Sequence, residues 1–496
     1  MASVLAIDLG GSALKACLFD LEGRQLASTS HPLGFAEDKG RSEQDPGVWW
    51  QALLEAATSL SAKAPDAFDS LTAIATCGFT RTQIFLDAGG KALRPAIGFR
   101  DSRAQALAEE LCRLPGVERQ REAKHLNGFH PLARLAWLQR EEPEVWQATR
   151  LLLEPKDYLN LRLTGQAASD PVSQERLLRA TAGGADSLAA AVGLESVPLP
   201  PLIAPTQEVG RVQQGLPQPL AKLAGARVYC GANDSWTAAA GLAALKPGRA
   251  YCLSGSSEVF GLLANTEAQA PGLIALLWGE GLWHLGGPGM NGANALDWIV
   301  NLLDPRALPS DERLESLLAA PCSGLPLLCH PYLLGERVPF WDPDLRASFI
   351  GLSARHQPGD LVRAVMEGVA FLNRLVLERA ETASGQRTPA VRLAGGGSRN
   401  AAWNQIRANC LGRPLLVSSQ GEMGLAGCLA VTRVGLGLDP DVVNAAEAIA
   451  GDLVTYDPDP AFQARADALY AVFKEMQESL AGASHRLARI GEAAER

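Results

Sequence analysis

The chain has 496 residues, with 45 Lys or Arg against 54 Asp or Glu, so its formal net charge is −9. At about 150 residues per domain, this length predicts two or three domains and excludes a single small module. The composition, 47% hydrophobic and 20% charged, supports large cores and excludes a disordered chain. The negative net charge argues against a surface that binds nucleic acid. It is still compatible with one positively charged pocket that binds a small anion.

No apolar stretch is long enough to span a bilayer, and the N-terminus lacks the basic region and cleavage site of a signal peptide. We therefore expect a cytoplasmic protein without membrane or nucleic-acid partners. The nine cysteines include no CxxC pair, which predicts buried free thiols and neither a zinc site nor a disulfide framework.

Apolar runs alternate with turn residues over residues 4–31, VLAIDLGGSALKACLFDLEGRQLASTSH. This alternation predicts an antiparallel meander of three strands. Residues 248–263, GRAYCLSGSSEVFGLL, repeat the strand, small-residue turn and strand. Such a repetition predicts two related domains.

Strands and helices alternate through the rest of the chain, which indicates an α/β fold. We expect helices over residues 46–60, 102–114, 132–141, 235–245 and 359–380, and strands over 71–77, 227–230 and 390–393. The tripeptide KPG at 246–248 interrupts the pattern. It predicts an N-terminal domain over 1–246, a second domain over 247–440, and a helical extension over 441–496 that packs on the core. In this extension we expect an amphipathic helix over 461–480 and a frayed end beyond Gly482.

Three glycine-rich segments follow predicted strands. The N–H groups of such turns can approach phosphate oxygens because no Cβ atoms obstruct them. The first segment follows Asp8, whose carboxylate suits Mg²⁺ beside a nucleotide, although a plain hairpin turn explains the motif equally well. The third precedes a helix expected near Asn400, where an anion or base can dock. The segments are Gly10-Gly11-Ser12, Gly255-Ser256-Ser257 and Gly395-Gly396-Gly397. None matches a P-loop or a strict GxGxxG.

Asp234 lies in GANDSWTAAAG, between a predicted strand and a helix of small residues. An Asp in this position is usually the N-cap of the helix. The alternative is a general base at a helix N-terminus. The spacing alone favours the cap.

Several segments together resemble the FGGY family of carbohydrate kinases, which have the two-domain fold of actin, hexokinase and Hsp70. Residues 347–368, ASFIGLSARHQPGDLVRAVMEG, are similar to the family's C-terminal signature. Residues 129–141, FHPLARLAWLQRE, are similar to the N-terminal one, with Arg134 where the family usually has Lys. Further similar segments are SEQDPGVWW (42–50), PKDYLNLRLTG (155–165), PYLLGERVP (331–339) and GGGSRNAAWNQIRANCLGRPL (395–415).

This resemblance implies two ribonuclease H-like domains flanking a cleft, and ATP-dependent phosphorylation of a sugar, polyol or sugar-acid hydroxyl with Mg²⁺. It makes Asp234 the catalytic base, reversing the interpretation as a cap. It makes Asp8 the metal-associated carboxylate, holding Mg²⁺ through water. The whole pattern is most similar to xylulokinases. The sequence is compatible with a homodimer. The implied ATP-binding residues are Gly10, Gly11, Ser12, Lys15, Gly255, Ser256, Ser257, Gly395, Gly396, Gly397 and Asn400.

The implied substrate pocket departs from the family pattern. Gly11 replaces a Thr, and Ser235 stands where Asn or Gln is frequent. Thr80-Arg81 replaces the Met-His of xylulokinases and the Arg-Glu of glycerol kinases, and Phe99-Arg100-Asp101 replaces Trp-Asn-Asp or Trp-Gln-Asp. The implied substrate-binding residues are Thr80, Arg81, Phe99, Arg100, Asp101, Asn233 and Ser235.

Two arginines therefore lie near the expected sugar. We hypothesise that one or both bind an anionic group, as in an aldonate, because guanidinium pairs bidentately with carboxylate. The alternative is that they point to solvent or pair with acids such as Asp101. Other acceptors, such as a tetritol, and a non-catalytic sugar-responsive regulator of the same fold are further alternatives. Retention of both Asp8 and Asp234 argues against the regulator.

Overall fold

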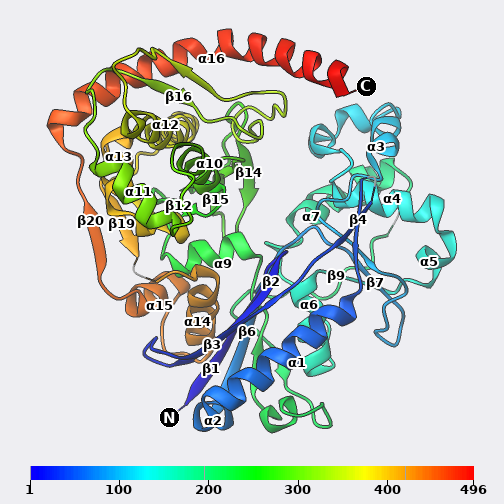
Figure 1. Cartoon of the computed structure of the whole chain (residues 1–496). Coiled ribbons are helices and arrows are strands. Elements are labelled where there is room, and N and C mark those ends of the chain that lie inside the picture. The colour runs from blue at the N-terminus through cyan, green and yellow to red at the C-terminus, as the bar shows by residue number, and fades with distance from the viewer. Residues whose placement is uncertain (1, 39, 195, 419, 496) are drawn as a thin grey trace. The chain divides into compact units, whose positions relative to one another are not determined.

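The computed structural model describes residues 2–38, 40–194, 196–418 and 420–495. The chain divides into two compact units, described here one at a time. Unit 1 contains Met1–Ala243 and Met423–Ile449, and unit 2 contains Ala244–Glu422 and Ala450–Arg496. Each unit is built on one large sheet with helices around it, so the predicted α/β class is confirmed (Figure 1).

Unit 1 is built on a six-stranded sheet in the order β10-β11-β6-β1-β2-β3. Its strands are β1 (Ser3–Leu9), β2 (Ala13–Asp20), β3 (Gln25–Pro32), β6 (Leu71–Gly78), β10 (Glu208–Arg211) and β11 (Arg227–Tyr229). The first three pair antiparallel, which confirms the predicted meander. Strands β6 and β11 run parallel to β1. The carboxyl ends of β1, β6 and β11 therefore meet at one edge, where open α/β sheets bind ligands.

Unit 2 is built on a seven-stranded sheet in the order β14-β15-β13-β12-β18-β19-β20. Its strands are β12 (Ala250–Ser254), β13 (Glu258–Ala264), β14 (Ile274–Leu277), β15 (Trp283–Pro288), β18 (Val391–Ala394), β19 (Leu415–Ser418) and β20 (Leu453–Tyr456). Strands β12, β13 and β15 pair antiparallel, with β14 at the edge beside β15, and β18 and β19 run parallel to β12. Both sheets thus combine three antiparallel strands, which begin with a hairpin, with two strands parallel to the first, so the predicted strand, turn and strand repeat is confirmed.

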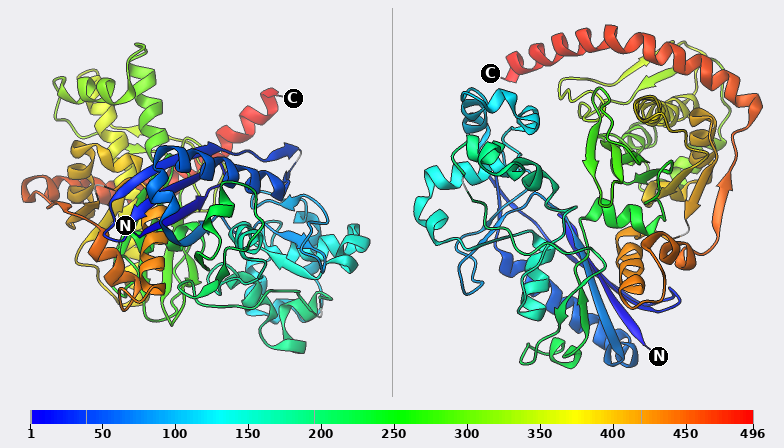
Figure 2. Two further views of the ribbon diagram at one scale, coloured as in Figure 1. Left: turned by 90° about the horizontal axis from the view of Figure 1, so that it is seen from below. Right: turned by 180° about the vertical axis from the view of Figure 1, so that it is seen from behind.

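Helices cover both faces of the unit 1 sheet. Helices α1 (Pro46–Lys63) and α6 (Pro155–Thr164) lie on one face, and α9 (Asp234–Gly241) and α14 (Met423–Gly435) on the other (Figure 1). Figure 2 shows the same layers from two further sides. The face under α1 buries side chains from alternate positions of β1, including Leu5, Ile7 and Leu9. The intervening positions, among them Asp8, face α14.

The segment Met423–Ile449 returns from the far end of the chain to pack on β1, β6 and α9. A Cβ atom at Gly427 would lie 1.8 Å from the carbonyl oxygen of Thr237, so α14 approaches α9 this closely only because residue 427 is Gly. The predicted ranges 247–440 and 441–496 divide this segment between the second domain and the extension. The compact units differ from that prediction because helix packing, rather than chain order, joins α14 and α15 (Val442–Ile449) to unit 1.

Smaller elements complete both units. In unit 1 they are β4 (Ala36–Asp38), β5 (Arg41–Gln44), β7 (Ile84–Leu86), β8 (Ala96–Ile97), β9 (Leu151–Leu153), α2 (Pro65–Asp69), α3 (Gln105–Leu111), α4 (Pro131–Glu141), α5 (Pro143–Ala148), α7 (Glu175–Thr181) and α8 (Leu188–Ala191). In unit 2 they are β16 (Leu328–His330), β17 (Ser348–Ile350), α10 (Ala293–Leu303), α11 (Ser310–Ala319), α12 (Pro358–Ser384), α13 (Ala401–Leu411) and α16 (Pro460–Glu495).

Several predicted helix ends are wrong: the helix expected over 46–60 extends to Lys63, the one over 102–114 covers only Gln105–Leu111, and the one over 359–380 covers Pro358–Ser384. Helix α9 stops at Gly241 rather than at 245, because Ala243 adopts a left-handed backbone with φ 52°. Helix α16 does not fray beyond Gly482 but continues to Glu495. Its last part is held by Ser484, whose hydroxyl accepts a hydrogen bond from Arg346 N at 3.1 Å, and by His485, which lies 2.7 Å from the Asp342 carboxylate.

All nine cysteines are free thiols, and seven are buried as predicted. The prediction of burial is wrong for Cys112 and Cys322, which are exposed. Among the described residues, no helix combines the length and apolar character that crossing a membrane requires.

Candidate functional site

The carboxyl edge of the unit 1 sheet brings Asp8 and Asp234 together. Asp8 is half-buried in β1 and lies beside Cys77 in the parallel register with β6. The next residue of β6, Gly78, forms a bridge with Asn233, directly before Asp234. The pKa of the Cys77 thiol is raised well above 9.0 by its hydrogen bond with Cys428, by burial, and by the negative charges of Asp8 and Asp234. Both carboxylates therefore act on the same buried thiol.

Asn233, and not Asp234, caps helix α9. Its side-chain oxygen accepts a hydrogen bond from Trp236 N at 2.8 Å. Asp234 is the first helical residue, and its carboxylate accepts hydrogen bonds from Ser235 N at 2.6 Å and Ser235 Oγ at 3.2 Å. The interpretation of Asp234 as the cap is therefore wrong. Asn233 and Ser235, the two predicted substrate-binding neighbours, also orient the helix start and the Asp234 carboxylate.

Burial raises the pKa of Asp234 above its ordinary value, whereas the hydrogen bonds from Ser235 and the positive charge of Arg81 lower it. The cation of Arg81 thus acts on the Asp234 carboxylate from a different loop, after β6. A partly buried carboxylate of raised pKa at a helix N-terminus has the properties of a proton acceptor.

Asp8 faces a gap left by a glycine of α14. A Cβ atom at Gly424 would lie 2.6 Å from Asp8 Oδ2, so only Gly leaves space for the carboxylate there. Lys15 of β2 pairs with Asp8 in the antiparallel register. Carboxylate oxygens are hard ligands of the kind that Mg²⁺ takes, usually with several retained waters. The residues around Asp8 therefore fit a hydrated Mg²⁺.

The first glycine turn lies against a predicted substrate residue. Gly10 N donates to Ala13 O at 2.9 Å and closes the turn, and Ser12 is exposed at its tip. A Cβ atom at Gly11 would lie 3.2 Å from the ring of Phe99. The absence of a side chain at Gly11 thus leaves space for the Phe99 ring. That ring joins an aromatic cluster with Phe35 at 6.0 Å and Phe79 at 5.8 Å between ring centroids.

The two arginines of the anion hypothesis differ in their surroundings. Thr80 is half-buried and Arg81 exposed, and the Arg81 charge acts on Asp234. The Arg100 side chain is 67% exposed, lies over the Phe99 ring and pairs with Glu37 at 3.4 Å. For Arg100 the structure therefore favours the alternative of a surface ion pair, although its partner is Glu37 rather than Asp101.

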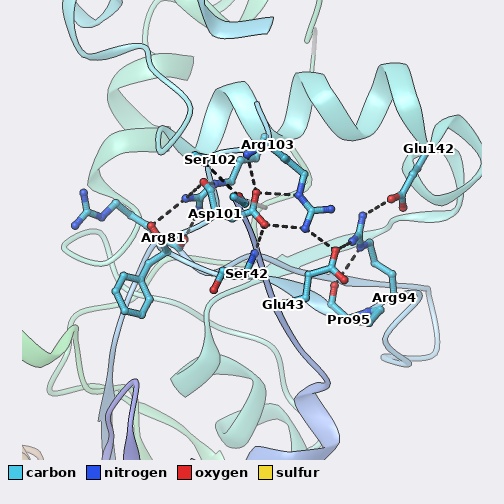
Figure 3. Close-up of polar contacts among 12 residues, drawn as sticks. Ser42, Glu43, Arg81, Arg94, Pro95, Asp101, Ser102, Arg103 and Glu142 are labelled. Carbon is cyan, nitrogen blue, oxygen red and sulfur yellow. Dashed lines mark hydrogen bonds and ion pairs between the residues drawn. The ribbon is translucent and has the colours of Figure 1, made fainter. Parts of the chain in front are cut away.

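Asp101 is fully buried, and Arg103 and Ser42 occupy both of its carboxylate oxygens. Oδ1 accepts hydrogen bonds from Arg103 N and Nε, and Oδ2 accepts them from Arg103 Nη2 and Ser42 N, at 2.7–3.0 Å. Burial by itself raises the pKa of Asp101, but these hydrogen bonds outweigh it and the pKa is lowered. Figure 3 shows the charges continuing from Arg103 through Glu43 and Arg94 to Glu142. The Asp101 carboxylate thus holds its loop in place.

A buried charge cluster behind the Arg81 loop was not predicted as part of the site. Lys156 Nζ lies 2.5 Å from Asp157 and 2.8 Å from Asp170. Asp157, Asp170 and Cys230 come close enough together to hold a metal ion, but the ammonium group of Lys156 already lies among them. Directly before this cluster, the buried Glu154 accepts hydrogen bonds from the backbone of the Arg81 loop. The charged run EPKD at the start of a buried helix was the signal in the sequence.

The other two glycine segments meet in unit 2. The Gly255-Ser256-Ser257 turn joins β12 to β13, and its carbonyls accept hydrogen bonds from Ala293 N and Asn294 N at the start of α10. Cβ atoms at Gly395 and Gly397 would lie 2.4 and 2.2 Å from Ser254, the residue before the turn, whereas Gly396 faces open space. Asn400 caps α13, its side-chain oxygen accepting from Trp403 N at 2.8 Å.

A buried arginine joins these two glycine segments. Arg407 donates to Ser254 Oγ at 2.7 Å and to Gly397 O at 3.0 Å, and forms an ion pair with Glu258. Its guanidinium also stacks 3.6 Å from the centroid of the Trp403 ring. Nothing in the spacing of Glu258 and Arg407 indicated this pair, which no local motif brings together.

The repeated sheet topology and the two sets of glycine turns define a two-domain fold of the actin and hexokinase type. Residues 3–241 match the N-terminal domain and residues 250–435 the C-terminal domain of the FGGY family of carbohydrate kinases. The chain belongs to this family, and it is an enzyme that phosphorylates a sugar with ATP.

Three similar proteins illustrate the relationship. The chain is 29% identical to the xylulose kinase of Lactococcus lactis, over 99% of this chain and 100% of that protein. It is 30% identical to the xylulose kinase of Escherichia coli, over 85% of this chain and 87% of that protein. The crystal structure of xylulose kinase from Rhodospirillum rubrum superposes with a TM-score of 0.81 at 27% identity, over 97% and 100% of the two chains.

Proposed function

We propose that Asp234 is the general base that accepts the proton of the acceptor hydroxyl during phosphoryl transfer from ATP. As the hydroxyl oxygen bonds to the γ-phosphorus, the bond from that phosphorus to the β–γ bridging oxygen breaks. The proton passes to the Asp234 carboxylate and ADP departs. The observation that carries this proposal is that the parallel pairing of β1 with β6 and the bridge between Gly78 and Asn233 bring Asp8 and Asp234 to one carboxyl edge.

We further propose that Asp8 holds Mg²⁺ through water, since the gap at Gly424 gives its carboxylate room. When bound, Mg²⁺ neutralises charge on the phosphates of the nucleotide. The glycine turns of both units, with Lys15 and Ser256 and Ser257, are the groups we expect to contact ATP. The N-H groups of such turns stabilise phosphate charge without any need for a basic surface. The cleft between the domains and the cytoplasmic location remain predictions.

The first candidate acceptor is a ketose such as xylulose, because the similar proteins of Lactococcus lactis and Escherichia coli are xylulose kinases. The second candidate is an aldonate, which the Arg81 cation beside Asp234 favours. Arg100 does not strengthen this second candidate, because it pairs with Glu37 at the surface.

A panel of acceptors distinguishes the candidates. We expect ADP release with at least one ketose, polyol or aldonate. If Arg81 binds a carboxylate, Arg81→Met lowers kcat/KM for the aldonate by about tenfold to a hundredfold more than for a neutral sugar. Turnover of ketoses or polyols without turnover of any aldonate would remove the aldonate and leave the kinase assignment intact.

The charge of Arg81 also predicts a change in pH dependence. Asp234 must be ionised to accept a proton, so kcat/KM falls as pH falls through its pKa. Because the Arg81 cation lowers that pKa, Arg81→Met raises it, and the acid limb of the profile moves to higher pH. The measurement is kcat/KM against pH with a neutral acceptor.

The control for this shift is Arg211→Met, which removes an arginine whose side chain is 59% exposed, on β10. Its acid limb should coincide with that of the wild type. An acid limb in Arg81→Met that stays in place or moves to lower pH would show that Asp234 is not the titrating base.

A further inference from the structure

The backbone of the Arg81 loop is held on its N–H side by one buried carboxylate. Glu154 Oε1 accepts a hydrogen bond from Arg81 N at 3.1 Å, and Oε2 accepts one from Thr82 N at 3.0 Å. Arg81 itself has a left-handed backbone with φ 57°, which a non-Gly residue adopts only when its surroundings enforce it. Glu154 is 4% exposed, and burial raises its pKa to about 8.

The carbonyl side of the same loop is held by a buried arginine. Arg134 of α4 is fully buried and donates to Arg81 O at 2.5 Å. The same guanidinium donates to Phe99 O at 3.1 Å and to Asp101 O at 2.9 Å. One side chain thus joins the Arg81 loop to the Phe99–Asp101 loop by their main chains.

Burying the Arg134 guanidinium costs free energy, which indicates that its contacts hold the two loops in position. A buried cation whose nearest partners are carbonyls loses hydration, and burial lowers the pKa of Arg134 to about 10. The planar guanidinium fork reaches carbonyls in three directions, which the single ammonium of Lys cannot do in the same geometry. The three carbonyls that Arg134 contacts belong to Arg81, Phe99 and Asp101.

We propose that Glu154 and Arg134 form a clamp on the two loops and are positioning residues that set the affinity for the acceptor. The clamp holds the Arg81 peptide from both sides, and so fixes the position of the residue that carries the cation. It also fixes Phe99 against the turn at Gly11. The inference rests on the proposed function in one respect, that these loops contact the acceptor.

The kinetic test uses the full-length protein with Glu154→Gln and Arg134→Lys. The Gln side chain keeps one acceptor oxygen, so one of the two loop N–H groups loses its partner. We expect the KM for the acceptor to rise about tenfold in each variant, while the KM for ATP stays within twofold of the wild type.

Matched controls separate positioning from loss of stability. Glu175→Gln changes another buried carboxylate of unit 1, one that pairs with Arg179. Arg162→Lys changes an arginine that stacks on Trp50 and donates to Tyr158 OH. Both controls should leave the two KM values unchanged even where the thermal midpoint falls.

A second measurement needs no turnover. Hydrogen–deuterium exchange of whichever of the Arg81 and Thr82 amides loses its acceptor should be at least about tenfold faster in Glu154→Gln than in the wild type. Unchanged exchange, or faster exchange with an unaltered acceptor KM, would overturn the clamp. If the wild type phosphorylates no acceptor, the proposed function fails, and the exchange rates alone still decide whether the clamp exists.

Discussion

Replacing Asp234 by Asn lowers kcat about 10²- to 10⁴-fold while the KM for the acceptor changes little, because a positioned base acts mainly in the transition state. The Asn side chain has the same shape, and its carbonyl oxygen can still accept the hydrogen bond from Ser235 N. What disappears is the negative charge that receives the proton. Steady-state ADP release over a range of acceptor concentrations gives both constants.

The matched control is Asp87→Asn. Asp87 also accepts hydrogen bonds from backbone N–H groups, those of Gly89 and Lys91, but in a turn between β7 and the following segment. Its kcat should equal that of the wild type. Undiminished turnover in Asp234→Asn, with a folded protein by circular dichroism, would remove Asp234 as the base.

Adding a single methyl group at Gly424 lowers kcat by about 10²-fold, since a displacement of about 1 Å at a reacting group can cost that much. The Cβ atom of Gly424→Ala would lie 2.6 Å from Asp8 Oδ2, so the carboxylate or the helix must move. We also expect a loss of about 1–3 kcal/mol in the free energy of unfolding from overpacking. Kinetics at saturating substrates and urea unfolding measure the two effects.

The control for this substitution is Gly482→Ala in α16, another helical glycine. There the nearest atom to the added Cβ is the end of the Arg486 side chain, at 3.9 Å. Replacing Gly by Ala in a helix with free space should stabilise it by about 0.5–1 kcal/mol. Wild-type kcat in Gly424→Ala would contradict a catalytic position for Asp8.

Much of the architecture was predictable because its determinants are local. The alternation around Gly10 and Gly255 predicted both hairpins, and the two copies predicted the repeated topology. Parallel strands with neighbouring carboxyl ends then bring Asp8 and Asp234 to one edge. The choice between Asn233 and Asp234 as helix cap was not accessible in this way, since both residue types cap well and they are adjacent.

The parts that escaped prediction depend on contacts distant in the sequence. Glu154 binds an amide 73 residues away, and Arg134 binds a carbonyl 53 residues away. The periodicity of a sequence does not predict such distant pairs. A charged residue in an otherwise apolar helix is also predicted to be exposed, even where it is buried. The ion pair of Arg100 escaped prediction for a related reason, because its partner, Glu37, lies on a separate strand.

The return of Met423–Ile449 to the first unit has a consequence for synthesis on the ribosome. Helix α14 covers the face of β1 that carries Asp8, and β1 is among the first residues made. That face stays uncovered until translation has passed residue 449, by which time most of unit 2 has emerged. The N-terminal unit therefore cannot complete its fold before most of unit 2 has been made, and a fragment ending at Ala243 lacks the helix that covers this face of its sheet.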